Sequence, residues 1–181
     1  MGAVPVSEPL RDGHLESTDL EGWFELTGIP RRATELMVEV AAIGFGYRLC
    51  RITVQPERPI ILNVSDVTGT LIIQPLGGLH RGNPFFQKPI LYLVHNNSVA
   101  GLPQIERWAV LNGGGVTGEA MVVPQMEPGH YRLCTALITE FPLLVSGAFP
   151  PNRCVDGELL PGQELIIAPP ASGIPSNKSR R

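Results

Sequence analysis

The sequence predicts an all-β protein made of two antiparallel β-sandwiches in tandem, of the transthyretin-like or immunoglobulin-like kind. Many short segments alternate between apolar and polar side chains, which is the period of a half-buried strand. Turn residues separate these segments, with 20 Gly and 18 Pro among 181 residues. Hydrophobic residues make up 43% of the chain, enough to bury a core in each module. Long helices are not expected.

The predicted strands share this alternation and are bounded by Gly, Pro or Asp. They span residues 23–26, 35–42, 50–55, 59–64, 69–74, 90–95, 105–111, 119–123, 130–137 and 164–168. The segment 31–43 also fits a helix, because it contains no Gly or Pro and Leu36, Val40 and Ile43 would share one helical face. The alternation of Leu36, Val38 and Val40, with its β-branched valines, favours the strand.

A module boundary is expected just before the fresh strand pattern "VTGTLI". Residues 1–64 would form the first sandwich, 65–170 the second, and 171–181 a disordered tail. A weak internal repeat supports two modules, since a shift of 97 positions places Phe24 on Met121 and Leu36 on Leu133. We expect the first module to be N-terminally incomplete, with no opening strands before Gly13. The module would then either be truncated or borrow a strand.

Charge and hydropathy exclude two classes of partner. The net charge of -3 provides no basic field for a phosphate backbone, so nucleic acid is not an expected partner. No apolar stretch approaches the ~20 residues that span a bilayer. The N-terminal residues lack the apolar core of a signal peptide, so the chain is either cytoplasmic or part of a longer exported protein.

The three cysteines leave two alternatives open. Cys134 and Cys154 flank a loop-rich stretch and could form a disulfide in an oxidising compartment, with Cys50 left over. Alternatively, all three are buried and inert thiols. The sequence contains no C-x-x-C pair, so a structural zinc site is not expected.

No catalytic motif is recognisable. The nucleophile elbow G-x-S-x-G of serine hydrolases is absent, and the four histidines never occur at metal-ligand spacing. We therefore expect no enzyme activity, no cofactor and no metal. A metal-dependent enzyme assembled from distant residues is the less favoured alternative.

The stretch "TDLEGWFELTGIP" at residues 18–30, followed by "LMVEV" and "GFGY", resembles the carboxypeptidase regulatory-like domain, a transthyretin-like (prealbumin-like) β-sandwich. The resemblance in the first half rests on Asp19, Gly22, Phe24, Leu26 and Tyr47. In the second half "VTGTLI" is similar to the opening strand of that family. The similarity touches most of residues 15–170, through short motifs of turn and core residues.

The second half also carries the Pro-Gly-x-Tyr motif of that family, as Pro128, Gly129 and Tyr131. Pro128 and Gly129 suit the two middle positions of a type II turn. The resemblance implies a structural or protein-interaction module, in bacterial proteins that are secreted or belong to the cell envelope.

The first motif also has a physical explanation of its own. Asp19 can accept hydrogen bonds from its own turn, and Gly22 can adopt a positive φ. In the strand that follows, Phe24 and Leu26 would face the core, while Trp23 and Glu25 would point away from it.

These roles favour folding over catalysis. The expected function is therefore a non-catalytic module whose partners are neighbouring protein domains. The alternative is a carbohydrate-binding module that stacks sugar rings on the exposed aromatic side chains of Trp23 and Trp108.

Overall fold

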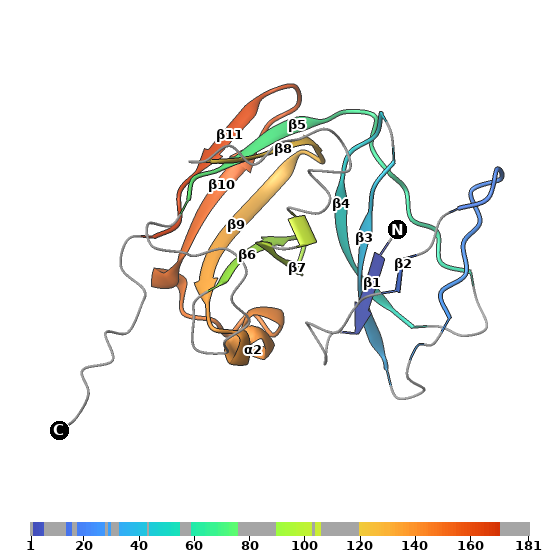
Figure 1. Ribbon diagram of the computed structural model, residues 1–181, viewed down its shortest axis with the longest axis horizontal. Coiled ribbons are helices and arrows are strands. Elements are labelled where there is room, and N and C mark those ends of the chain that lie inside the picture. The colour runs from blue at the N-terminus through green and yellow to red at the C-terminus, as the bar shows by residue number, and fades with distance from the viewer. Residues whose placement is uncertain are drawn as a thin grey trace.

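The computed structural model describes residues 2–5, 14–15, 18–27, 29, 33–42, 44–54, 59–75, 90–102, 104–105 and 120–170. These residues form three β-sheets, which confirms the predicted all-β class (Figure 1). The helix α2 is short (Phe141–Val145), as are the 3-10 turns η1 (Ile138–Glu140) and η2 (Pro151–Arg153). The predicted tail at 171–181, the residue Trp108 and most of the predicted strand 105–111 lie outside the described residues.

The first sheet is antiparallel and has the strand order β2-β1-β3-β4. Its strands are β1 (Gly2–Pro5), β2 (His14–Leu15), β3 (Glu35–Val40) and β4 (Arg48–Thr53). β3 settles the ambiguous segment in favour of a strand. The expectation that no strand precedes Gly13 was wrong, because β1 pairs with β3 along its whole length. Four residues ending in proline carry too little alternation to be recognised as a strand.

The predicted strands 23–26 and 59–64 were also wrong, since neither segment forms a ladder in the structure. In the sheet order β2-β1-β3-β4 neither segment pairs with a strand at the edge of the sheet. Both segments instead run along the face of the first sheet that points away from the rest of the protein (Figure 1), where Leu26, Leu62 and Val64 pack against its apolar cluster. Alternation predicts which side chains share a face, but it does not determine whether the backbone pairs with a neighbouring strand.

The remaining strands form a sandwich of two sheets, with the orders β11-β5-β8 and β10-β9-β6-β7. One sheet contains β5 (Gly69–Ile73), β8 (Met121–Met126) and β11 (Glu164–Ile167). The other contains β6 (Ile90–His95), β7 (Ser98–Gly101), β9 (Gly129–Ala136) and β10 (Cys154–Leu159). β5 and β11 are parallel neighbours, whereas the other pairs in this sandwich are antiparallel.

The predicted strands 69–74, 90–95, 130–137 and 164–168 are confirmed to within one residue at each end. The strand predicted at 119–123 occurs at 121–126 instead. The type II turn predicted at Pro128 and Gly129 was wrong, because Gly129 has a φ of 144° and begins β9. The chain here passes from one sheet of the sandwich to the other, so it does not reverse beside the strand it has just left.

The main core lies between the two sheets of the sandwich and extends to the first sheet. This core contains Leu71, Val123 and Leu133 of the sandwich. It also contains Leu49 of β4 and Tyr47, which directly precedes β4. The backbone N–H of Tyr47 donates to the carbonyl oxygen of Gln125, which ties β4 to the end of β8. The described residues before 65 thus form one sheet fastened to a complete sandwich, and a second sandwich in tandem stays a prediction.

Candidate binding groove

The face of the first sheet that points away from the sandwich is apolar. Leu36, Val38 and Val40 of β3 lie on it and form a small cluster with Cys50. The opposite side of β3 is covered, since Met37 packs into the cluster around α2 and its sulfur accepts a hydrogen bond from the N–H of Val99 at 3.4 Å. The inner side of β3 is therefore packed, and its apolar outer side needs a cover of its own.

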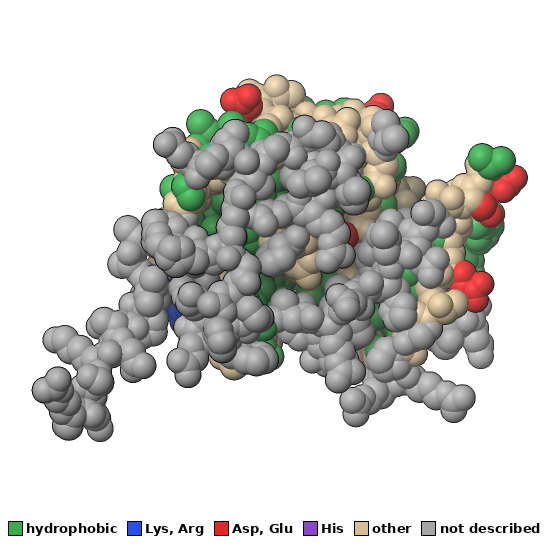
Figure 2. All heavy atoms as spheres, in the orientation of Figure 1, with side chains coloured by type: hydrophobic (Ala, Val, Ile, Leu, Met, Phe, Trp, Pro, Cys, Tyr) green, Lys and Arg blue, Asp and Glu red, His purple; other side chains and the backbone are tan. Residues whose placement is uncertain are grey.

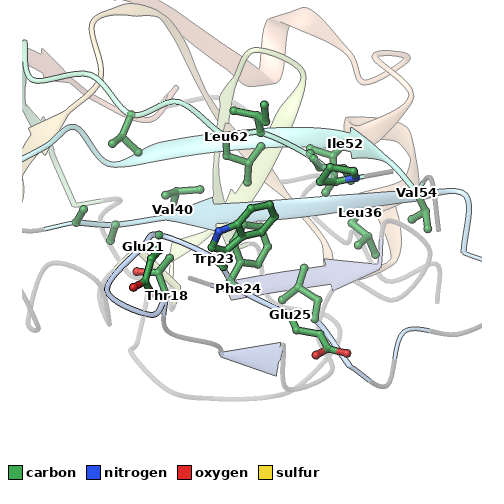
Figure 3. A pocket seen from close by; sticks show the side chains of 18 of the residues that line it. Thr18, Glu21, Trp23, Phe24, Glu25, Leu36, Val40, Ile52, Val54 and Leu62 are labelled. Carbon is green, nitrogen blue, oxygen red and sulfur yellow. The ribbon is translucent and has the colours of Figure 1, made fainter. Parts of the chain in front are cut away.

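A rigid turn at residues 18–23 begins one part of that cover. The carboxylate of Asp19 accepts hydrogen bonds from the N–H groups of Glu21 at 3.1 Å and Trp23 at 2.8 Å. Gly22 has a φ of 86° and donates to the Asp19 carbonyl oxygen at 3.1 Å. This is the turn expected from Asp19 and Gly22. It leads into Trp23, which lies in front of β3 (Figure 3), and Leu26 packs against the outer cluster of the sheet.

The cover is incomplete and leaves an open cavity of about 1130 Å³ between the sheet and two segments of chain (Figure 3). One wall is formed by residues from 18–26 and by Ile29, and the other by residues from 59–64. The floor is formed by Leu36 and Val40 of β3 together with Ile52 and Val54 at the end of β4. We call this cavity the groove. Its volume lies just above the usual range for ligand sites, about 300–1,000 Å³.

Trp23 lies in front of β3 over this groove, with Phe24 beside it (Figure 3). The Trp23 side chain is 65% exposed. Ile61 on the opposite wall is 81% exposed. Phe24 and Leu26 are only half-buried, because they border the groove and do not enter the main core. One large apolar side chain thus stands open to solvent on each wall of the groove.

The charged groups among the described residues that line the groove are acidic. Glu21 and Glu25 are exposed and line the same wall as Trp23, together with Thr18. No Lys, Arg or His occurs among the described residues that line the groove. Acidic and apolar side chains lie together over the projecting turn in the space-filling view (Figure 2). The groove can therefore bind apolar groups and attract positive charge at its rim.

The other residues of the family-like motifs serve the core. Tyr47 and Tyr131 are 1% and 0% exposed, respectively. The Tyr131 hydroxyl donates to the carbonyl oxygen of Glu127 at 2.5 Å, and burial raises the pKa of Tyr131. Pro128 lies in the short connection before β9. The structure brings none of these three residues to the groove.

None of the three cysteines lines the groove, although Cys50 on β4 belongs to the apolar cluster beneath it. Cys134 and Cys154 are directly paired residues of β9 and β10 and form a disulfide. Cys50 is buried as a free thiol, and burial raises its pKa, so it is a poor nucleophile.

The sequence does not indicate that residues 59–64 form a wall of the groove. This segment reads as an ordinary strand, and nothing in its composition distinguishes an exposed Ile61 from a buried one. Outside the groove, the surroundings of the buried His95 on β6 cannot be predicted from the sequence either, because they depend on the ring of Tyr131 and on the backbone of Gly129.

Comparison with known proteins assigns no family to this chain, because no protein-family model, curated protein or solved structure matches it. Within the described ranges, no set of three or more His, Cys, Asp or Glu side chains is placed to hold a metal ion. No helix among the described residues is long and apolar enough to cross a bilayer.

Proposed function

We propose that the protein is a non-catalytic β-sandwich module of the carboxypeptidase regulatory-like kind that binds another polypeptide through the groove. The observation that carries this proposal is an apolar cavity with Trp23 and Ile61 exposed on its two walls. Exposed apolar surface that is concentrated in one concave patch is typical of interaction sites. Tryptophan is also enriched among the residues that dominate binding energy at interfaces.

The rest of the molecule suits the role of a rigid support. In the part of the chain that the structure describes, the sandwich packs seven strands in two sheets around a buried core. The first sheet is fixed to that core by Tyr47 and Leu49. Secretion or an envelope location is the proposed setting, and the disulfide between Cys134 and Cys154 supports it, since such bonds persist in oxidising compartments.

Carbohydrate binding is the second candidate function. The exposed indole of Trp23 could stack on a sugar ring, with Glu21 and Glu25 as acceptors for hydroxyl groups. The floor and the other wall are mainly aliphatic and offer sugar hydroxyls few partners. The polypeptide is therefore the preferred ligand.

Site-specific photocrosslinking tests the preferred function. A photoreactive benzoylphenylalanine is placed at position 61, on the groove wall, and in a matched protein at position 166, which is also an exposed isoleucine but lies on β11. Illumination in cells that produce the chain should give a discrete crosslinked polypeptide from position 61 and not from position 166. Crosslinking at both positions or at neither would contradict the proposal.

A glycan titration tests the second candidate. A shift of tryptophan fluorescence with a soluble glycan that is lost in Trp23→Ala would favour carbohydrate binding. A flat response across a glycan panel leaves the polypeptide as the ligand.

A further inference from the structure

We propose that the occupant of the groove is a single extended strand from another polypeptide, with alternating apolar residues and with Lys or Arg at its ends. This inference rests on the proposed interaction function and specifies its partner. The strand would lie between the two walls of the groove and complete a second layer over β3 and β4.

The two walls of the groove favour a strand as the occupant. Residues 23–27 and 59–64 alternate between exposed and half-buried side chains, as strands do. However, no backbone hydrogen bond joins residues 24–26 or 60–62 to another described residue. The wall at 59–64 is held at its C-terminal end, where Arg48 donates to the Asn63 carbonyl oxygen and the Gly46 N–H donates to the carbonyl oxygen of Ser65 at 2.6 Å. Each wall thus offers unpaired backbone groups to an incoming strand.

The spacing of the apolar side chains on the floor of the groove also favours a strand. Leu36 and Val40 come from one face of β3, and Ile52 and Val54 occupy alternate positions at the end of β4. Every second side chain of a strand laid in the groove would point down onto these residues. β3 has six residues, which corresponds to about 20 Å at ~3.3 Å per residue. A strand of similar length would cover it. Main-chain pairing gives affinity in this mode of recognition, and pockets for alternate side chains give specificity.

The negative charge on the rim of the groove favours basic residues at the ends of this strand. Glu21 and Glu25 stand exposed on the rim, and the described lining residues include no cation to balance them. Complementary charge on a partner raises the association rate and disfavours partners of like charge. Basic residues that flank the apolar segment would meet these carboxylates.

The experiment is a selection from a displayed library of random nine-residue peptides, carried out on the full chain. Two variants give a matched pair: Ile61→Lys adds a charge on the groove wall, and Ile166→Lys makes the same change on β11. Both positions are exposed, so neither change should disturb the fold. Selected peptides are then synthesised and their dissociation constants are measured by calorimetry.

We expect the selected peptides to carry apolar residues at i, i+2 and i+4 with Lys or Arg outside them. Their binding should weaken at least tenfold in Ile61→Lys and stay unchanged in Ile166→Lys. A proline at the centre of the peptide should also weaken binding at least tenfold, because it removes a backbone donor. The double variant Glu21→Lys, Glu25→Lys should reverse the preference, so that peptides with Glu at their ends bind better than those with Lys.

Other outcomes would overturn the inference and identify what is wrong. Groove-binding peptides with apolar residues at i, i+3 and i+4 would show a helix as the occupant, and the interaction function would stand. Self-association abolished by Ile61→Lys would identify a second copy of this chain. No peptide sensitive to Ile61→Lys, together with no crosslink from position 61, would overturn both the strand and the proposed function.

Discussion

His95 stacks face to face on Tyr131, with ring centroids 4.3 Å apart and ring planes inclined by only 11°. The two residues are directly opposite each other on β6 and β9. The side chain of His95 is 2% exposed. Burial and the positive charges of Arg48 and His130 lower the pKa of His95 to about 4. The imidazole is therefore neutral in the folded protein at pH 7.

This arrangement predicts a loss of stability in mild acid. The pKa of His95 falls from 6.5 in the unfolded chain to about 4 in the folded protein, so between these values the unfolded chain binds more protons. The stability that the neutral ring contributes is full above pH 6.5 and is lost as the pH falls through 4. We expect a loss of about 2 to 3 kcal/mol between pH 7 and pH 4 from this group. Urea denaturation at both pH values measures it, and His95→Gln should show a smaller difference; an equal difference would contradict the assignment to His95.

Substituting Gly129 should be more costly than substituting Gly22. A Cβ at Gly129 would lie 2.8 Å from Nε2 of His95, whereas a Cβ at Gly22 would meet nothing within 4 Å. Both glycines have a positive φ, at 144° and 86°. We expect Gly22→Ala to cost about 1 kcal/mol from its backbone conformation alone and Gly129→Ala about 2 kcal/mol or more. Denaturation midpoints of the two variants decide the matter, and equal losses would show that His95 moves aside without cost.

The disulfide between Cys134 and Cys154 should raise the stability of the sandwich. It closes a loop with a sequence separation of 20 residues. A bond closing a loop of this size contributes about 3 kcal/mol, chiefly through the unfolded chain. The double variant Cys134→Ser, Cys154→Ser should lose that amount in thermal or urea denaturation. In the unreduced wild-type chain a thiol reagent should detect only Cys50, and only after unfolding; three reactive thiols would show that the bond does not form.

Substitution of a side chain by alanine should have different effects on stability and ligand binding at the floor and at the wall of the groove. Leu36 is 2% exposed on the floor, and Trp23 is 65% exposed on the wall. Leu36→Ala should destabilise the protein by about 2 to 4 kcal/mol through the cavity that it leaves. Trp23→Ala should change stability by less than about 1 kcal/mol and weaken ligand binding. Denaturation and peptide-binding measurements on both variants separate the roles, and a large loss of stability in Trp23→Ala would make Trp23 a core residue.

Local pattern was sufficient for much of the fold. The alternation of Leu36, Val38 and Val40 predicted β3, and Asp19 with Gly22 predicted the turn that holds Trp23. These features depend on side chains a few residues apart, whose preferences act before any distant contact forms. The strand β7 was missed because its four residues, SVAG, are too short and too small to show a period.

What the sequence alone determined was the all-β class, the positions of most strands in the sandwich and the turn before Trp23, since these follow from the spacing of apolar residues and from backbone freedom at glycine. Only the tertiary structure decided that residues 59–64 pack their side chains against the face of the first sheet and do not pair with the edge of β4. It also decided that His95 meets Tyr131 and that Trp23 and Ile61 stand on either side of one groove. The side chains of an extended segment alternate whether it pairs at a sheet edge or packs on a sheet face, so no local pattern distinguishes the two.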